Sequence, residues 1–236
     1  MDYKKEIISS GSLMSNASKY NELIFKKISK YIKGTTLEFG AGTGNFSEMI
    51  SKKVPELIVI DEKQKSIDFL NKRLNHLKNI KIHNSNLENL QISNCDTVIL
   101  LNVLEHIEND QNAIQKLMSF LNKDGYLIIQ VPALNYLFSE YDRMVGHYKR
   151  YEKNDIIKIC ENLKLDLKDL YYFNPIGALG WWYNYCYKKK TEKNDEEKNN
   201  TINQLKIYDK YIVPLINVLD TRFNPFGISL FAIIKK

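Results

Sequence analysis

Short apolar runs alternate with helical patterns along the chain as far as Val131. Between Asn21 and Lys33 the apolar side chains recur every three or four positions, which predicts a leading helix that ends near Gly34. Apolar runs bounded by turn residues predict strands at Thr35–Phe39, Leu57–Ile60, Ile80–His83, Asp96–Leu101 and Tyr126–Val131. Helical spacing between these runs predicts helices at Asn45–Lys53, Gln64–Leu77 and Asp110–Leu121.

Strands that alternate with helices are typical of parallel strands joined by right-handed crossovers. Residues 97–101 read Thr-Val-Ile-Leu-Leu, a pattern that favours a strand buried on both faces over one with a solvated face. The pattern therefore predicts a doubly wound α/β sheet.

The pattern changes after Pro132, where an aromatic and charged stretch covers residues 136–151. Beyond it we predict two helices, Asp155–Leu163 and Ile202–Leu219. We also predict two strands, Leu165–Phe173 and Ile228–Ile234, each following one of these helices. Residues 188–200 contain no apolar side chain, and we expect a mobile loop there.

Composition excludes several classes of protein. Hydrophobic residues make up 44% and charged residues 26% of the 236, as in soluble globular proteins. No run approaches the ~18 apolar residues of a membrane span, and residues 1–20 lack a secretory signal, so we expect a cytoplasmic protein. Three distant cysteines argue against disulfides and structural zinc. The net charge is +6, but only four of the 34 basic residues are Arg, so we expect no nucleic-acid partner.

A glycine-rich loop follows the first predicted strand. Residues 37–44 read Leu-Glu-Phe-Gly-Ala-Gly-Thr-Gly and hold three of the ten glycines, directly before a predicted helix, which predicts a nucleotide-binding turn. The dinucleotide fingerprint requires a glycine at position 45, but this chain has Asn45 there. This difference disfavours a nicotinamide dehydrogenase, which we keep as an alternative.

Two carboxylates narrow the choice of ligand. Glu38 at the strand end would repel a pyrophosphate but attract the ammonium of an amino-acid ligand such as S-adenosylmethionine. Asp61 ends the second predicted strand, where a carboxylate can accept both ribose hydroxyls.

With these residues the sequence resembles the class I S-adenosylmethionine-dependent methyltransferases, whose first motif is an acid, one residue, then G-x-G-x-G. The resemblance implies a Rossmann-like, mostly parallel seven-stranded sheet with an antiparallel last strand. It also implies a single domain, 1–236, with a leading segment 1–34, a cofactor core 35–131, a substrate cap 132–215 and a closing segment 216–236. The cofactor contacts implied are Glu38, Gly40, Ala41, Gly42, Gly44, Asp61, Asn86, Leu87 and Asn102.

One of these positions departs from the family pattern. Asn86 stands where the family usually has an Asp that receives the adenine amino group, although its amide still offers a carbonyl acceptor. The Leu87 backbone N–H would contact the adenine ring, and Asn102 begins a segment, 102–107, that resembles the family's cofactor-facing loop.

The strongest acceptor-side candidates lie in residues 142–151, just beyond the fifth predicted strand. Within this range Gly-His-Tyr-Lys-Arg-Tyr at 146–151 resembles a G-H-Y-x-R-Y segment of a methyltransferase subgroup. His147 is either a general base or a pin that holds the loop, and Tyr148 is a second candidate. Glu105 and His106 resemble part of a Glu-x-x-Glu-His metal motif of some related enzymes. Because Asn102 replaces the first acid, we expect no metal.

An aromatic segment, 177–187, precedes three lysines, so residues 177–190 either rest on a membrane surface or form a core helix and a solvated loop. The family resemblance implies an enzyme that transfers a methyl group from S-adenosylmethionine to a small molecule or a lipid-linked acceptor. The second acceptor is implied by the subgroup's similarity to methyltransferases of glycan and lipid-linked sugar pathways. A regulatory protein that binds the cofactor without catalysis is the alternative.

Overall fold

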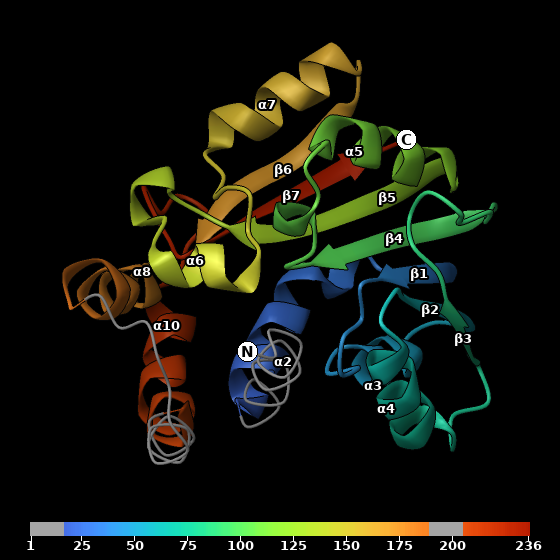
Figure 1. The fold of residues 1–236 in the computed structure, drawn as a ribbon, viewed down its shortest axis with the longest axis horizontal. Coiled ribbons are helices and arrows are strands. Elements are labelled where there is room, and N and C mark those ends of the chain that lie inside the picture. Colours follow the sequence, from blue (N-terminus) through green and yellow to red (C-terminus); the bar gives the residue numbers. More distant parts are fainter. Residues whose placement is uncertain (1–16, 189–204) are drawn as a thin grey trace.

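The computed structural model describes residues 17–188 and 205–236, and their strands form one seven-stranded sheet in the order β3-β2-β1-β4-β5-β7-β6 (Figure 1). The strands are β1 Thr35–Phe39, β2 Glu56–Asp61, β3 Ile80–Asn84, β4 Cys95–Leu101, β5 Leu121–Pro132, β6 Asp166–Phe173 and β7 Ser229–Lys235. The last strand, β7, is antiparallel to both of its neighbours, β5 and β6, while the other paired strands are parallel. The predicted mostly parallel, doubly wound sheet is confirmed.

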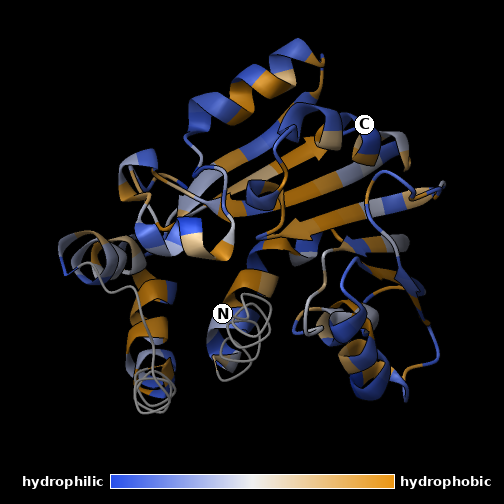
Figure 2. Ribbon diagram, viewed as in Figure 1, coloured by the Kyte–Doolittle hydropathy of each residue, from blue (hydrophilic) through white to orange (hydrophobic). Residues whose placement is uncertain are grey.

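The central strands are buried on both faces, as the apolar run at 97–101 predicts. Along β4, Val98 and Leu100 pack into the core on one face of the sheet, and Ile99 packs into the core on the other. Figure 2 shows hydrophobic colour over the central parts of β4, β5 and β7. This alternation follows from the period of two residues in a strand.

Helices cover both faces (Figure 1). The core on one face takes apolar side chains from four helices: α2 Ser18–Ile28, α3 Ser47–Ser51, α4 Gln64–Leu74 and α10 Val213–Leu219. The core on the other face takes them from α5 Asp110–Ser119, α7 Lys153–Asn162 and α8 Pro175–Trp181. Within 17–188 and 205–236, no helix has both the length and the apolar composition of a membrane span.

Several boundaries differ from the sequence expectations. The leading helix α2 ends at Ile28 and continues only as a 3-10 turn, η1 Ser29–Tyr31. Strand β5 begins earlier than predicted, but Asp124 near its start has a φ of +63° and interrupts the ladder as a turn. Of the predicted mobile loop 188–200, all but Lys188 lies outside the described residues.

The segment after β5 contains one helix that the sequence patterns did not predict and one, within 177–187, that they gave as one of two alternatives. A short helix, α6 Glu140–Val145, lies within the aromatic and charged stretch. The aromatic segment forms the end of α8 and then one π-helical stretch, η4 Trp182–Tyr187. Within the predicted cap range 132–215, β6 is an edge strand of the central sheet.

Candidate active site

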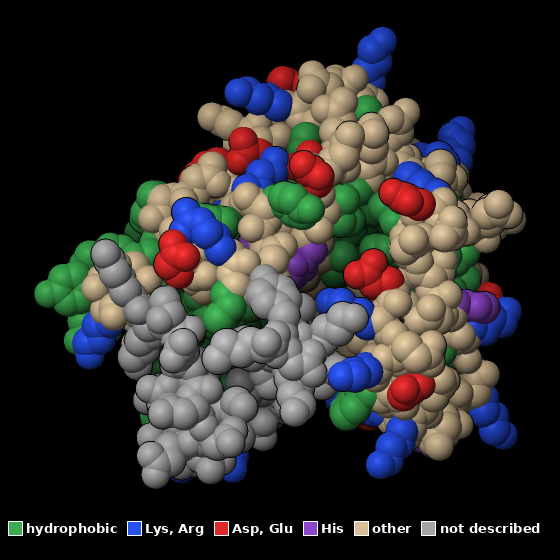
Figure 3. Space-filling view, in the orientation of Figure 1, with side chains coloured by type: hydrophobic (Ala, Val, Ile, Leu, Met, Phe, Trp, Pro, Cys, Tyr) green, Lys and Arg blue, Asp and Glu red, His purple; other side chains and the backbone are tan. Residues whose placement is uncertain are grey.

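The predicted cofactor residues lie near the point where the order of the strands reverses, between β1 and β4. Strand β1 lies between β2 and β4, so that the loops after β1 and β4 leave the same edge of the sheet. These loops touch, because a Cβ on Gly40 would lie 2.4 Å from Val103 Cγ2. In the space-filling view this face is hollowed beside the carboxyl end of β4, with a histidine and hydrophobic side chains visible in the hollow (Figure 3). Ligands of open α/β sheets bind at such switch points.

The glycine loop has the backbone that its sequence requires. Gly40 and Gly42 have φ values of +75° and +57°, in the left-handed region that favours glycine. The Gly40 N–H donates to the Ile60 carbonyl at 2.8 Å, which ties the loop to β2. A Cβ built on Gly42 meets no atom within 4 Å, so the loop presents open space and bare backbone to a ligand.

Asp61 supports this loop from the end of β2. Its Oδ2 accepts the Gly42 N–H and its Oδ1 accepts the Lys63 N–H, both at 2.9 Å. A carboxylate has about four lone-pair sites, so two remain for the hydroxyls of a ribose. Asp61 therefore fits both a structural role and the predicted role toward the cofactor.

Glu38 is buried beneath the loop with 4% of its surface exposed. Its Oε2 accepts a hydrogen bond from the Ser47 hydroxyl at 2.5 Å. Burial, and to a lesser degree the Asp61 carboxylate, raise the pKa of Glu38 to about 7, although the Ser47 bond and Arg73 oppose the shift. A buried carboxyl with this pKa gains a partner when a cationic ammonium binds beside it.

The remaining predicted cofactor residues lie at the same edge of the sheet. Asn102 follows β4 with a φ of +56°, a strained conformation for a residue with a side chain, and its N–H donates to the Gln130 carbonyl at 2.8 Å. The Asn86 side-chain carbonyl accepts the Asn89 N–H at 2.9 Å, so one of its two lone pairs is used locally. Leu87 is half-buried against the core.

The predicted acceptor-side residues begin in helix α6 and continue after it. Ser139 and Asp142 form a capping box at its start, in which the Asp142 carboxylate accepts the Ser139 N–H and hydroxyl, each at 2.9 Å. Gly146, with a φ of +85°, ends the helix. The backbone N–H of His147, the next residue, donates to the Asp142 carbonyl at 2.9 Å. Sequence reasoning missed this helix, although the spacing Ser139, Asp142, Gly146 is a signal that could have found it.

Asp142 is fully buried and connects His147 to Arg150. Its Oδ1 lies 2.8 Å from His147 Nδ1 and accepts the Arg150 Nε–H at 3.0 Å. Burial alone would raise the pKa of Asp142, but the hydrogen bond from His147, followed by the charge and the hydrogen bond of Arg150, brings it below its usual value. The ionised carboxylate only accepts, so His147 carries a proton on Nδ1, and the neutral form of this ring has its lone pair on Nε2. No sequence pattern assigns a role to Asp142.

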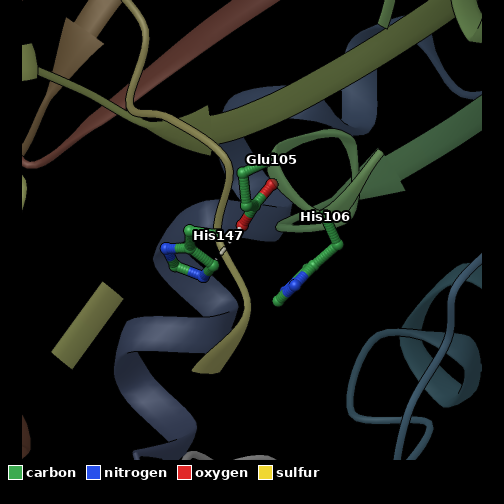
Figure 4. A group of neighbouring side chains, drawn as sticks. All are labelled: Glu105, His106 and His147. Atoms are coloured by element: carbon green, nitrogen blue, oxygen red, sulfur yellow. Dashed lines mark ion pairs between the residues drawn. The ribbon is translucent and has the colours of Figure 1, made fainter. Parts of the chain in front are cut away.

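Glu105 and His106 follow β4 in a 3-10 turn, η2 Leu104–His106, and converge with His147 (Figure 4). Burial raises the pKa of Glu105 to about 8. Partial loss of water around the ring, and then the neighbouring His147, lower the pKa of His106 to about 4. The Tyr148 side chain is 58% exposed, and its N–H donates to the Glu105 carbonyl at 2.8 Å.

The comparisons with known proteins agree with this arrangement. Residues 16–183 match a family model described as a methyltransferase domain, and the chain belongs to this family. An uncharacterized methyltransferase of Staphylococcus carnosus is 25% identical over 150 residues, which are 62% of this chain and 68% of that protein.

Solved structures show the same fold. A putative methyltransferase from Bacillus halodurans superposes with a TM-score of 0.58 at 14% identity, over 86% of this chain and 92% of that chain. The N-methyltransferase NodS from Bradyrhizobium japonicum, in complex with S-adenosyl-L-homocysteine, superposes with a TM-score of 0.57 at 15% identity, over 91% of this chain and 84% of that chain.

The protein is thus an S-adenosylmethionine-dependent methyltransferase of the class I fold. This family assignment replaces the dehydrogenase alternative, which the residue at position 45 already disfavoured.

Proposed function

We propose that this methyltransferase acts on a small-molecule or lipid-linked acceptor, held between the cofactor loop and the segment that follows β5. The observation that carries the proposal is the Asp142–His147 pair. A buried carboxylate fixes the ring at 2.8 Å, and the loop that bears His147 is hydrogen-bonded to the β4 loop through Glu105. A proton acceptor with a fixed tautomer is therefore held next to the switch point of the sheet.

The chemistry follows from these positions. The acceptor oxygen or nitrogen forms a bond to the methyl carbon while the bond from this carbon to the sulfonium sulfur breaks. A hydroxyl or ammonium acceptor also loses a proton, which His147 Nε2 takes. Glu38 pairs with the ammonium of the donor, and Asp61 holds its ribose. Catalysis depends mainly on holding donor and acceptor in line.

Exposed apolar side chains support a lipid-linked acceptor and a cytoplasmic enzyme with peripheral membrane contact. Four residues of α8 and η4 are between 45% and 68% exposed: Leu179, Trp182, Tyr183 and Tyr187. Aromatic side chains beside lysines are typical of surfaces that rest in a membrane interface. The proposed contact covers residues 177–190, of which the last two lie outside the described residues.

The experiment is to incubate the protein with S-adenosylmethionine labelled in the methyl group and three fractions of a cell extract. These are a deproteinised small-molecule filtrate, a lipid extract and the macromolecules. The proposal expects label in the filtrate or the lipids. Label confined to protein or nucleic acid would overturn it, and label in no fraction would favour the non-catalytic alternative.

Gly42→Arg is the matched control for this assay. The side chain enters the open space in front of Gly42 and the left-handed φ of +57° strains any residue that has a Cβ, so both effects remove cofactor binding. Native mass spectrometry with S-adenosylmethionine checks the loss of binding. Label that persists in this variant comes from another enzyme in the extract.

A further inference from the structure

Three ligand-type side chains converge at the mouth of the site. One ligand atom from each of Glu105, His106 and His147 lies within 4.8 Å of the others. Figure 4 shows Glu105 and His147 facing each other with His106 beside them, from the loop after β4 and the segment after α6. His147 Nε2 lies 3.9 Å from Glu105 Oε1.

In both histidines Nδ1 has a partner outside the three ligand side chains. His147 Nδ1 is bound to the Asp142 carboxylate at 2.8 Å, and His106 Nδ1 lies 3.2 Å from the Gly146 carbonyl. A carbonyl only accepts, so Nδ1 of His106 also carries the proton and Nε2 keeps its lone pair. Histidines that bind metals almost always have such an outer partner, which fixes the tautomer and the ring orientation.

Glu105 provides an independent observation. Only 1% of the residue is exposed, and among the described residues neither carboxylate oxygen has a hydrogen-bond partner. Buried polar atoms are nearly always paired, because leaving one unpaired costs free energy. A cation between Glu105 and the histidines would supply the missing partner.

We propose that Glu105, His106 and His147 bind a divalent transition-metal ion such as Zn²⁺. Two imidazoles and one carboxylate form the ligand set of many catalytic zinc sites, and imidazole favours such metals over Mg²⁺ and Ca²⁺. Ligand atoms ~2.1 Å from an ion are at most about 4 Å apart, so the 4.8 Å cluster must contract slightly. The exposed His106 side chain can make this movement.

The third ligand explains why the sequence predicts no metal. With Asn102 in the first position of the motif, Glu105 and His106 alone are too few ligands, and His147 joins them only through the fold. Three protein ligands leave a coordination position open for the acceptor oxygen or nitrogen. A bound ion would lower the pKa of the acceptor group, whose proton would leave to solvent water because His147 Nε2 is then a metal ligand and not the base. Only this last role rests on the proposed function.

The test is calorimetric titration of the chelator-treated protein with Zn²⁺, with any affinity tag removed and neither methyl donor nor acceptor present. Co²⁺ titration followed by visible absorption reports the coordination. We expect one ion per chain. Glu105→Gln, His106→Ala and His147→Ala should each weaken binding by more than about 100-fold, since even outer partners are worth 10–100-fold.

The other two histidines, His76 and His83, are exposed and lie outside the cluster, which makes His76→Ala and His83→Ala matched controls. Absence of binding by the parent protein, an equal loss in the controls, or full affinity in Glu105→Gln would overturn the proposal. If His147→Ala unfolds, Glu105→Gln and His106→Ala decide. Binding here needs no methyl transfer, so failure of the labelling assay leaves this result standing.

Discussion

At the scale of single residues, the site contains buried carboxylates, and hydrogen bonds from a few neighbouring groups offset the cost of burying them. Asp61 divides its two oxygens between the backbone N–H groups of Gly42 and Lys63. Glu38 has the Ser47 hydroxyl but lacks a cationic partner at hydrogen-bonding distance among the described residues. Because Glu38 lacks such a partner, we expect its ionisation to depend on whether the ammonium of the ligand is bound beside it.

Cofactor binding should therefore depend on pH through Glu38. The pKa of this carboxyl is about 7, and only the ionised form pairs with the ammonium. S-adenosylmethionine should bind about tenfold more tightly at pH 7 than at pH 5.5, since the ionised fraction rises by about this factor. Without ligand the sign is opposite: the pKa is raised on folding, so this carboxyl destabilises the protein as pH rises from 4.5 to about 7.

Calorimetry on Glu38→Gln tests this dependence. The variant should bind roughly ten- to a hundredfold more weakly at pH 7, because a charge-assisted bond of ~1.5–3 kcal/mol is lost. Its affinity should also stay level between pH 5.5 and 7. Parental affinity in the variant would refute the role of Glu38.

His147→Ala separates the two roles that the sequence leaves open. If Nε2 acts in the reaction, by taking the proton or by binding the proposed ion, kcat should fall by ~10²–10⁴-fold with unchanged donor affinity. If His147 only pins the loop, the midpoint of thermal unfolding should fall and kcat should stay near the parental value. Turnover and melting are measured on the same preparation.

At the scale of elements, helix α6 is a short structure held by one buried carboxylate. Asp142 caps its first turn, binds His147 and pairs with Arg150, whose guanidinium lies 4.3 Å from the Trp181 ring centroid. Arg150 is only 1% exposed. The acceptor side of the site thus takes its shape from a network with Asp142 at its centre.

Asp142→Ala should destabilise the protein by about 3–5 kcal/mol, because it leaves the Arg150 guanidinium buried without its partner. The exposed ion pair of Glu140 with Arg143 in the same helix offers a matched control. Glu140→Ala should change the free energy of unfolding by less than about 1 kcal/mol. Urea unfolding of both variants measures the difference, and equal losses would contradict the network.

At the scale of the whole molecule, the end of the chain completes the middle of the sheet. Strand β7 is the last element, yet it lies between β5 and β6 and is antiparallel to both. Phe231 on this strand is fully buried, with its ring centroid 5.4 Å from that of Tyr171 and 5.5 Å from that of Phe173. Edge strand β6 is therefore attached to the sheet only through β7.

Phe231→Ala should lower the free energy of unfolding by about 3–5 kcal/mol, through the cavity it leaves. Phe223 is 93% exposed, and Phe223→Ala should stay within about 0.5 kcal/mol of the parent. Chemical denaturation followed by circular dichroism measures both. A small effect of Phe231→Ala would mean that β7 contributes little to holding β6.

The sequence by itself determined the strands, the class of sheet and the cofactor loop, since these depend on residues close together in the chain. Apolar runs such as 97–101 act through local periodicity, and the spacing from Glu38 to Gly44 is a local turn. The acceptor side was decided by tertiary structure. His147 meets Glu105 across about 40 residues only because the loops after β4 and α6 pack together. Which side chains converge depends on packing between elements, and no local pattern encodes it.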